Sequence, residues 1–147
     1  MAFPLTINLS YGQEKVETSE QKQKLGTRAT TPDGRVFYYA ENSGTAITHG
    51  GYLVDGIAAV AAHDMDVAAA ATSAGNTTFT SGTSLTTTKD QYKDGYLYFN
   101  DGPGQGETYK VKSNTAVSGA TGLSITIDEP DGLRTALTTS SLFGLMY

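Results

Sequence analysis

The chain has 147 residues and a formal net charge of −5, with 38% hydrophobic and 17% charged residues. This length allows one domain with a sizeable core. An acidic chain without a basic cluster lacks the electrostatic signature of nucleic-acid binding. The chain has no cysteine, which excludes disulfides and thiolate chemistry. No apolar run reaches the length of a membrane span, and the N-terminus lacks the features of a secretion signal. Neither nucleic acid nor a membrane is therefore an expected partner.

The residue types favour an all-β fold. The chain contains 9 Tyr and 17 Gly and is rich in Thr and Ser. Thr, Tyr and Val suit a pleated, half-buried strand, and Gly suits tight turns. We expect a small β-barrel or β-sandwich domain over residues 25–147, preceded by an extended N-terminal arm and tether over residues 1–24.

The N-terminal segment divides into two parts. Residues 5–11 alternate apolar and polar side chains, which is the periodicity of a strand. Residues 12–24 are polar and balanced in charge, so they gain little by burial and are typical of a tether. We expect the strand to add to a sheet of another protein; the alternative is that it forms the first strand of the domain's own sheet. Its expected anchors on a partner are Leu5, Ile7, Leu9 and Tyr11.

The next part of the sequence predicts a turn, then a strand, and then an Ala-rich run that has two interpretations. Residues 31–35 contain Pro and Gly at the positions that a β-turn requires. Residues 35–40 alternate as a strand with aromatic side chains on both faces, which indicates that both faces are covered, by the core or by a partner. The Ala-rich residues 57–71 are interpreted as two short strands joined near His63–Asp64, with a helix as the alternative.

The C-terminal half gives clearer strand patterns. Residues 95–100 and 108–113 alternate on either side of a Gly-rich loop, which predicts a β-hairpin. Ile125 and Ile127 are expected to face inward, and residues 129–132 form a turn. The chain ends on an apolar segment, which we expect to dock on its own domain or on a neighbouring molecule. The expected contact residues of this tail are Leu142, Phe143, Leu145 and Tyr147.

The sequence offers no complete motif for chemistry. The Gly-rich loop over residues 101–107 precedes a strand, whereas a phosphate loop precedes a helix. The acidic residues of the turns match no calcium-binding loop, and His49 and His63 are too far apart in sequence to form a zinc motif. No Gly-x-Ser-x-Gly elbow is present. We expect neither enzymatic activity nor a cofactor or metal.

Three segments resemble small virion proteins of tailed bacteriophages, namely capsid decoration or cement proteins. They are "LGTRATTPDGRVFYYAENSGTAI", "AAHDMDVAAAATSAGNTTFT" and "DQYKDGYLYFNDGPGQGETYKVKSN", and the likeness covers roughly residues 25–137. The resemblance implies an all-β domain on the outer capsid surface of the virion. It also implies that the major capsid protein and further copies of the chain, often as trimers, are the partners.

Three other classes stay open on the sequence. A tail adhesin or carbohydrate-binding module would be present in few copies per particle, whereas a cement protein is present in many. A small hydrolase would show a cleft with a perturbed carboxylate, and a tail-tube or head-completion protein would form rings.

Overall fold

The structure, a computed structural model of the chain, describes residues 6–42 and 56–147. Nearly all of the regular structure is β-strand, which confirms the all-β class. The chain divides into two compact units, residues 1–54 and 55–147. The sequence analysis instead placed a boundary after residue 24. We describe each unit by itself; Leu5 and His49 lie outside the described residues.

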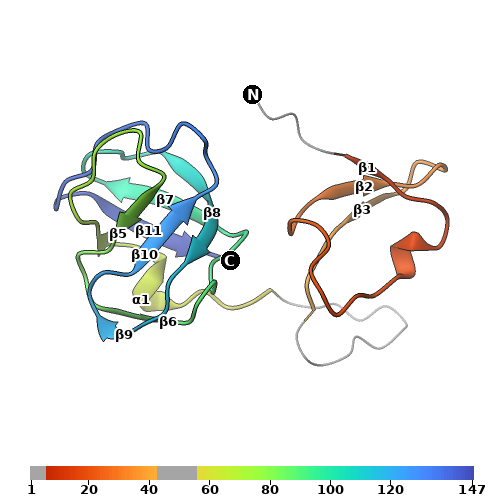
Figure 1. The fold of residues 1–147 in the computed structure, drawn as a ribbon, viewed down its shortest axis with the longest axis horizontal. Helices are drawn as coiled ribbons and strands as arrows, with labels where there is room; N and C mark the ends of the chain where they lie inside the picture. Colours follow the sequence, from red (N-terminus) through yellow and green to blue (C-terminus); the bar gives the residue numbers. More distant parts are fainter. Residues whose placement is uncertain (1–5, 43–55) are drawn as a thin grey trace. The chain divides into compact units, whose positions relative to one another are not determined.

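Unit 1 contains a three-stranded sheet in the order β1-β2-β3 (Figure 1). β1 (Ile7–Asn8) runs parallel to β2 (Arg28–Thr30), and β3 (Val36–Tyr38) runs antiparallel to β2. The predicted turn joins β2 to β3. In this turn the Gly34 N–H donates to the Thr31 carbonyl at 2.9 Å, and Gly34 has a φ of 85°, a conformation that favours glycine.

The N-terminal strand of unit 1 pairs within the chain. Ile7 lies opposite Ala29, and the Leu9 N–H donates to the Thr30 carbonyl at 2.8 Å. This pairing is the one that the alternative interpretation of residues 5–11 described. The polar segment that follows contains a 3-10 helix over Gln13–Lys15 and is otherwise irregular.

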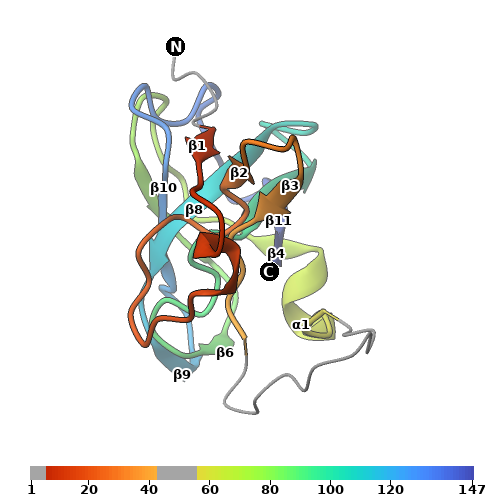
Figure 2. The same ribbon diagram turned by 90° about the vertical axis from the view of Figure 1, so that its right-hand side faces the viewer.

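Unit 2 is built on one six-stranded antiparallel sheet in the order β4-β11-β7-β8-β10-β5. The sheet curls into a half-barrel (Figures 1 and 2). A bridge between Ala69 and Ser81 connects its two edge strands, with the Gly82 N–H donating to the Ala68 carbonyl at 2.7 Å. The six strands are β4 (Val67–Ala68), β5 (Thr78–Thr80), β7 (Tyr96–Asp101), β8 (Thr108–Asn114), β10 (Ser124–Ile127) and β11 (Leu142–Met146).

Two smaller elements accompany this sheet. A second, two-stranded sheet pairs β6 (Leu85–Thr87) with β9 (Val117–Ala120). A single helical turn, α1 (Ala61–Asp64), precedes β4 and packs against β11. The prediction of two short strands over residues 57–71 is therefore confirmed in part: β4 is a strand, and the helical turn α1, the alternative, lies where the first strand was expected. Alanine favours the helical turn, and Asp66 with a φ of 61° redirects the chain into β4.

The hydrophobic core lies inside unit 2. Each strand of the six-stranded sheet contributes at least one buried apolar side chain, and the rings of Phe79 and Phe143 meet edge to face at 5.2 Å. The predicted hairpin of residues 95–113 is confirmed as β7 and β8, and Ile125 and Ile127 face inward as predicted. Period-two alternation succeeds here because only one face of each strand meets the core.

Candidate interaction surfaces

The sheet of unit 1 has one half-covered face and one exposed face. Ile7, Ala29 and Phe37 lie side by side across the three strands and define the inner face. Among the described residues of unit 1, Ala29 and Thr31 alone are fully buried. Val36 and Tyr38 point to the outer face and keep 42% and 65% of their surface exposed. The expectation that both faces of this strand are covered is therefore not met within the chain.

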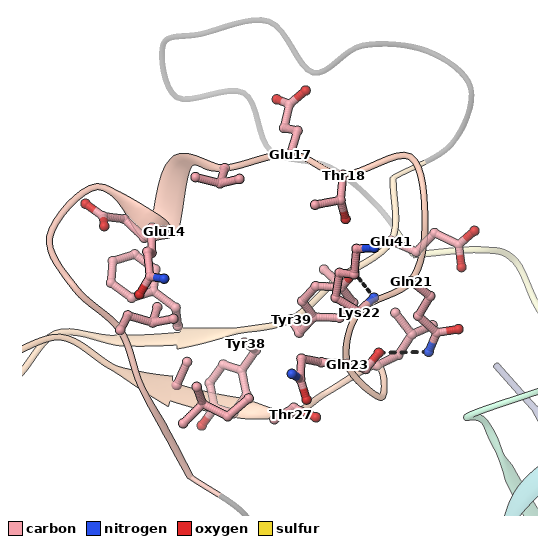
Figure 3. A pocket seen from close by; sticks show the side chains of 18 of the residues that line it. Glu14, Glu17, Thr18, Gln21, Lys22, Gln23, Thr27, Tyr38, Tyr39 and Glu41 are labelled. Carbon is pink, nitrogen blue, oxygen red and sulfur yellow. Dashed lines mark hydrogen bonds between the residues drawn. The ribbon is translucent and has the colours of Figure 1, made fainter.

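Residues 13–24 form an arch over the inner face, and the hollow between the arch and the sheet has a volume of about 910 Å³ (Figure 3). The arch is attached to β3 at two points. The Lys22 N–H donates to the Tyr39 hydroxyl at 3.0 Å, and the Glu14 carboxylate, nearly buried, lies 3.8 Å from the Arg35 guanidinium. Half-buried apolar side chains line the sheet side of the hollow, and amides, hydroxyls and carboxylates line the arch side.

Two side chains of unit 1 have pKa values that are shifted from their usual range. The pKa of Tyr39 is lowered, chiefly because its hydroxyl accepts the Lys22 N–H. The pKa of Asp33 is also lowered, chiefly by the hydrogen bond from the Thr31 hydroxyl and also by Arg35, whose Nε lies 2.7 Å from the carboxylate. These two hydrogen-bonded side chains lie on either side of β3 in the sequence.

The predicted arm residues lie at different depths. Ile7 and Leu9 are half-buried at the hollow, and Tyr11 is 65% exposed. The structure thus brings two of the predicted anchors together on the sheet of unit 1.

The predicted tail residues lie in β11 and at its end. Phe143 and Leu145 are buried in the core of unit 2, and Leu142 is half-buried beside them. This is docking on the chain's own domain, the first of the two options for the apolar end. Met146 and Tyr147 stay about two-fifths exposed, and Met146 lies opposite the exposed Tyr96 of β7.

A partly buried cluster of polar and aromatic side chains contacts the C-terminal residue of unit 2. The ring of Tyr147 stacks on Tyr92 at 4.9 Å, and the Tyr147 hydroxyl accepts a hydrogen bond from Gln91 at 2.8 Å. The Tyr92 hydroxyl lies 2.6 Å from Nδ1 of His63, which is 3% exposed. Burial lowers the pKa of His63 and is the chief reason that the pKa of Tyr92 is raised. His63 was expected where two short strands join; it is instead a buried residue of α1.

The sequence analysis missed the edge of β3 as a surface. The alternation over residues 35–40 assigns side chains to the two faces of the strand, and it does not identify which edge of the strand lacks a neighbour.

Three comparisons with known proteins gave no match: no family model, curated protein or solved structure resembles this chain significantly. Within residues 6–42 and 56–147 no group of three or more His, Asp or Glu side chains is arranged to hold a metal ion. Across the same residues, no helix has the length and apolar character needed to span a bilayer.

Proposed function

We propose that this chain is a non-enzymatic structural protein of a phage virion. In this role it decorates the outer surface of the capsid, bridges neighbouring major capsid protein subunits and acts as a trimer. The turn and strand pattern quoted above supports the proposal, and so does the all-β fold of the residues that carry it.

The observation that carries the proposal is the contrast between the two units. Unit 2 has its own hydrophobic core, and a bridge joins its two edge strands, so its sheet is closed by residues of the same unit. The described residues of unit 1 include only two buried side chains, and they form a sheet with a half-covered face and with outer edges that no other described strand pairs. A small sheet of this kind gains stability when another chain covers it, and strand addition supplies main-chain hydrogen bonds for that purpose.

Trimerisation would strengthen such a contact. Three copies of unit 1 on one trimer bind together, so that modest individual affinities give a high avidity. The exposed apolar side chains at the end of unit 2 are candidates for the contact between barrels, because closed symmetric oligomers hide such surface. These side chains are Tyr96, Met146 and Tyr147.

The test is binding to capsids that lack a decoration protein. We expect the full chain to bind in amounts comparable to the shell protein, and a chain without residues 1–11 to bind poorly while its barrel stays folded. Ile7→Asp should weaken binding more than Lys15→Ala, because Ile7 is half-buried in the sheet and Lys15 is exposed. Equal binding of the full and the shortened chain would contradict a role for the N-terminal strand.

The alternative function is an adhesin or carbohydrate-binding module. It is favoured by Phe37 and Tyr39 at the hollow, which also contains the amides of Gln13, Gln21 and Gln23. Aromatic rings beside amide groups are suited to stacking on and hydrogen bonding to a sugar. The number of copies in a purified particle separates the two functions, since an adhesin is present in few copies.

A further inference from the structure

No other described strand of unit 1 pairs with the outer edge of β3, which presents backbone groups in a defined pattern. The Tyr39 N–H donates to the Thr27 carbonyl at 2.9 Å, and the Arg35 carbonyl accepts from Thr31 N–H at 3.1 Å. In an antiparallel ladder, alternate residues direct both backbone groups to the same neighbour. Residues 35, 37 and 39 therefore bond to β2, and Val36, Tyr38 and Ala40 direct their N–H and C=O groups away from it.

Among the described residues of unit 1, this edge lacks the features that usually protect an edge strand. Proteins shield such edges with Pro, Lys, a bulge or a covering segment. Residues 35–41 contain neither Pro nor Lys, and Val36 and Tyr38 remain exposed. The edge strands of unit 2, by contrast, are bridged to each other at Ala69 and Ser81. The β3 edge is thus prepared to accept a strand.

The sequence of this edge is complementary to itself. When two copies run antiparallel about Tyr38, position 36 faces position 40, 37 faces 39, and 35 faces 41. In that register every residue with outward backbone groups faces another such residue, which is the requirement for hydrogen-bonded pairs. It also places Arg35 opposite Glu41, Phe37 opposite Tyr39, and Tyr38 opposite its own copy. Opposite charges and aromatic pairs at facing positions stabilise a sheet.

We propose that a second copy of this chain binds at this edge, so that two unit 1 sheets join through β3 into one continuous sheet. The contact has two-fold symmetry, so each copy donates the same residues. Arg35 already contacts Asp33 and Glu14, and the incoming Glu41 carboxylate adds to this group of charges. The inference is independent of the role at a capsid, because it concerns two copies of the chain in solution.

The first test uses the absence of cysteine from the chain. In the proposed register the two Tyr38 positions are hydrogen-bonded neighbours with Cα atoms about 5.5 Å apart, within the range that a disulfide spans. The two Val36 positions are four residues out of register, or about 13 Å apart at ~3.3 Å per residue. Mild oxidation should therefore convert Tyr38→Cys to a covalent dimer and leave the matched control, Val36→Cys, uncoupled. Equal coupling of both variants would overturn the register.

The second test measures self-association of the full chain by sedimentation velocity. Glu41→Arg places two arginines opposite each other at both ends of the contact, and we expect dimer dissociation constants to rise roughly tenfold, as two exposed ion pairs become repulsive. The double variant Arg35→Glu/Glu41→Arg restores opposite charges and should restore the dimer.

Tyr38→Pro removes an outward N–H but no bond to β2, so it should abolish the dimer while the amide spectrum of the barrel is unchanged.

Each result of these experiments either supports the proposed dimer or overturns it. Loss with Glu41→Arg and recovery in the double variant support the proposal. A wild-type chain that shows no β3-dependent association up to millimolar concentration overturns it. Association that is unaffected by Tyr38→Pro and Glu41→Arg also overturns it. If both variants lose binding to undecorated capsids without any effect on self-association, the edge serves the shell protein, and the proposal fails while the proposed function stands.

Discussion

At the scale of the residue, His63 makes the stability of unit 2 depend on pH. Its ring is buried, its Nδ1 lies 2.6 Å from the Tyr92 hydroxyl, and burial lowers its pKa below the usual 6.5. The folded state therefore binds fewer protons than the unfolded state once the pH falls below about 6.5. Stability is fully present above that pH and decreases as the pH falls toward the folded-state pKa.

We predict that the free energy of unfolding decreases between about pH 6.5 and pH 5, above the range in which unperturbed carboxylates titrate. His63→Phe should flatten this dependence, although it also lowers stability at pH 7 because the Tyr92 hydroxyl loses its partner. Denaturant titrations at a series of pH values measure both effects. His49→Gln is the control, since His49 is the one other histidine in the chain. An unchanged slope in His63→Phe would mean that His63 is not the titrating group.

Gly144 is a second residue on which local packing depends. A Cβ at this position would meet the Asp64 carbonyl and the ring of Tyr98, whose hydroxyl donates to the same carbonyl. We predict that Gly144→Ala lowers the free energy of unfolding by about 1–3 kcal/mol, the usual cost of overpacking. Gly56→Ala is the matched control, because a Cβ there has open space and no positive φ opposes it. Thermal unfolding measures the difference; equal stability of the two variants would show that α1 shifts freely away from β11.

At the scale of the element, the two sheets differ in how firmly they are held. β7, β8, β10 and β11 place fully buried side chains such as Leu97, Val111 and Ile125 in one core. β1, β2 and β3 are at most three residues long, and their inner face is half-covered by the arch. A backbone amide exchanges when its hydrogen bond opens, so its protection from exchange increases with the free energy of that opening.

We predict that amide hydrogen exchange separates these strands. The amides of β7, β8 and β10 should exchange only on global unfolding of the barrel, and those of β2 and β3 should exchange faster by orders of magnitude. Binding of a second strand at the edge of β3 should slow the exchange of Val36 and Tyr38 in particular. Uniform protection across both sheets would contradict this division.

The elements also show what local pattern determines and what it leaves open. The β7–β8 hairpin was predictable because its alternation and its Gly-rich loop are adjacent in sequence. The pairing of Ile7 with Ala29 was not, because a parallel neighbour across a long polar segment depends on tertiary packing. Residues 25–40 resemble core strands in composition, yet they join a small sheet. Burial of His63 was likewise hidden, since its partner Tyr92 lies 29 residues away.

At the scale of the whole molecule, the division into two units implies that they differ in their ability to fold alone. Every member of the continuous core cluster lies between Val67 and Leu145, and the closing bridge between Ala69 and Ser81 also lies within this span. The described part of unit 1 contributes no side chain to that cluster. A unit with its own core is expected to fold alone.

We therefore predict that residues 56–147, produced as a separate chain, fold and unfold in one cooperative transition. Their amide spectrum should match the corresponding signals of the full chain, and Ile125→Ala should cost about 2–5 kcal/mol in both, since the same cavity forms. Residues 1–54 alone should show no cooperative transition, because a three-stranded sheet with so little buried surface has too small a core. If residues 56–147 fail to fold while the full chain is stable, unit 1 contributes to the barrel's stability, and the two units must be treated as one folding unit.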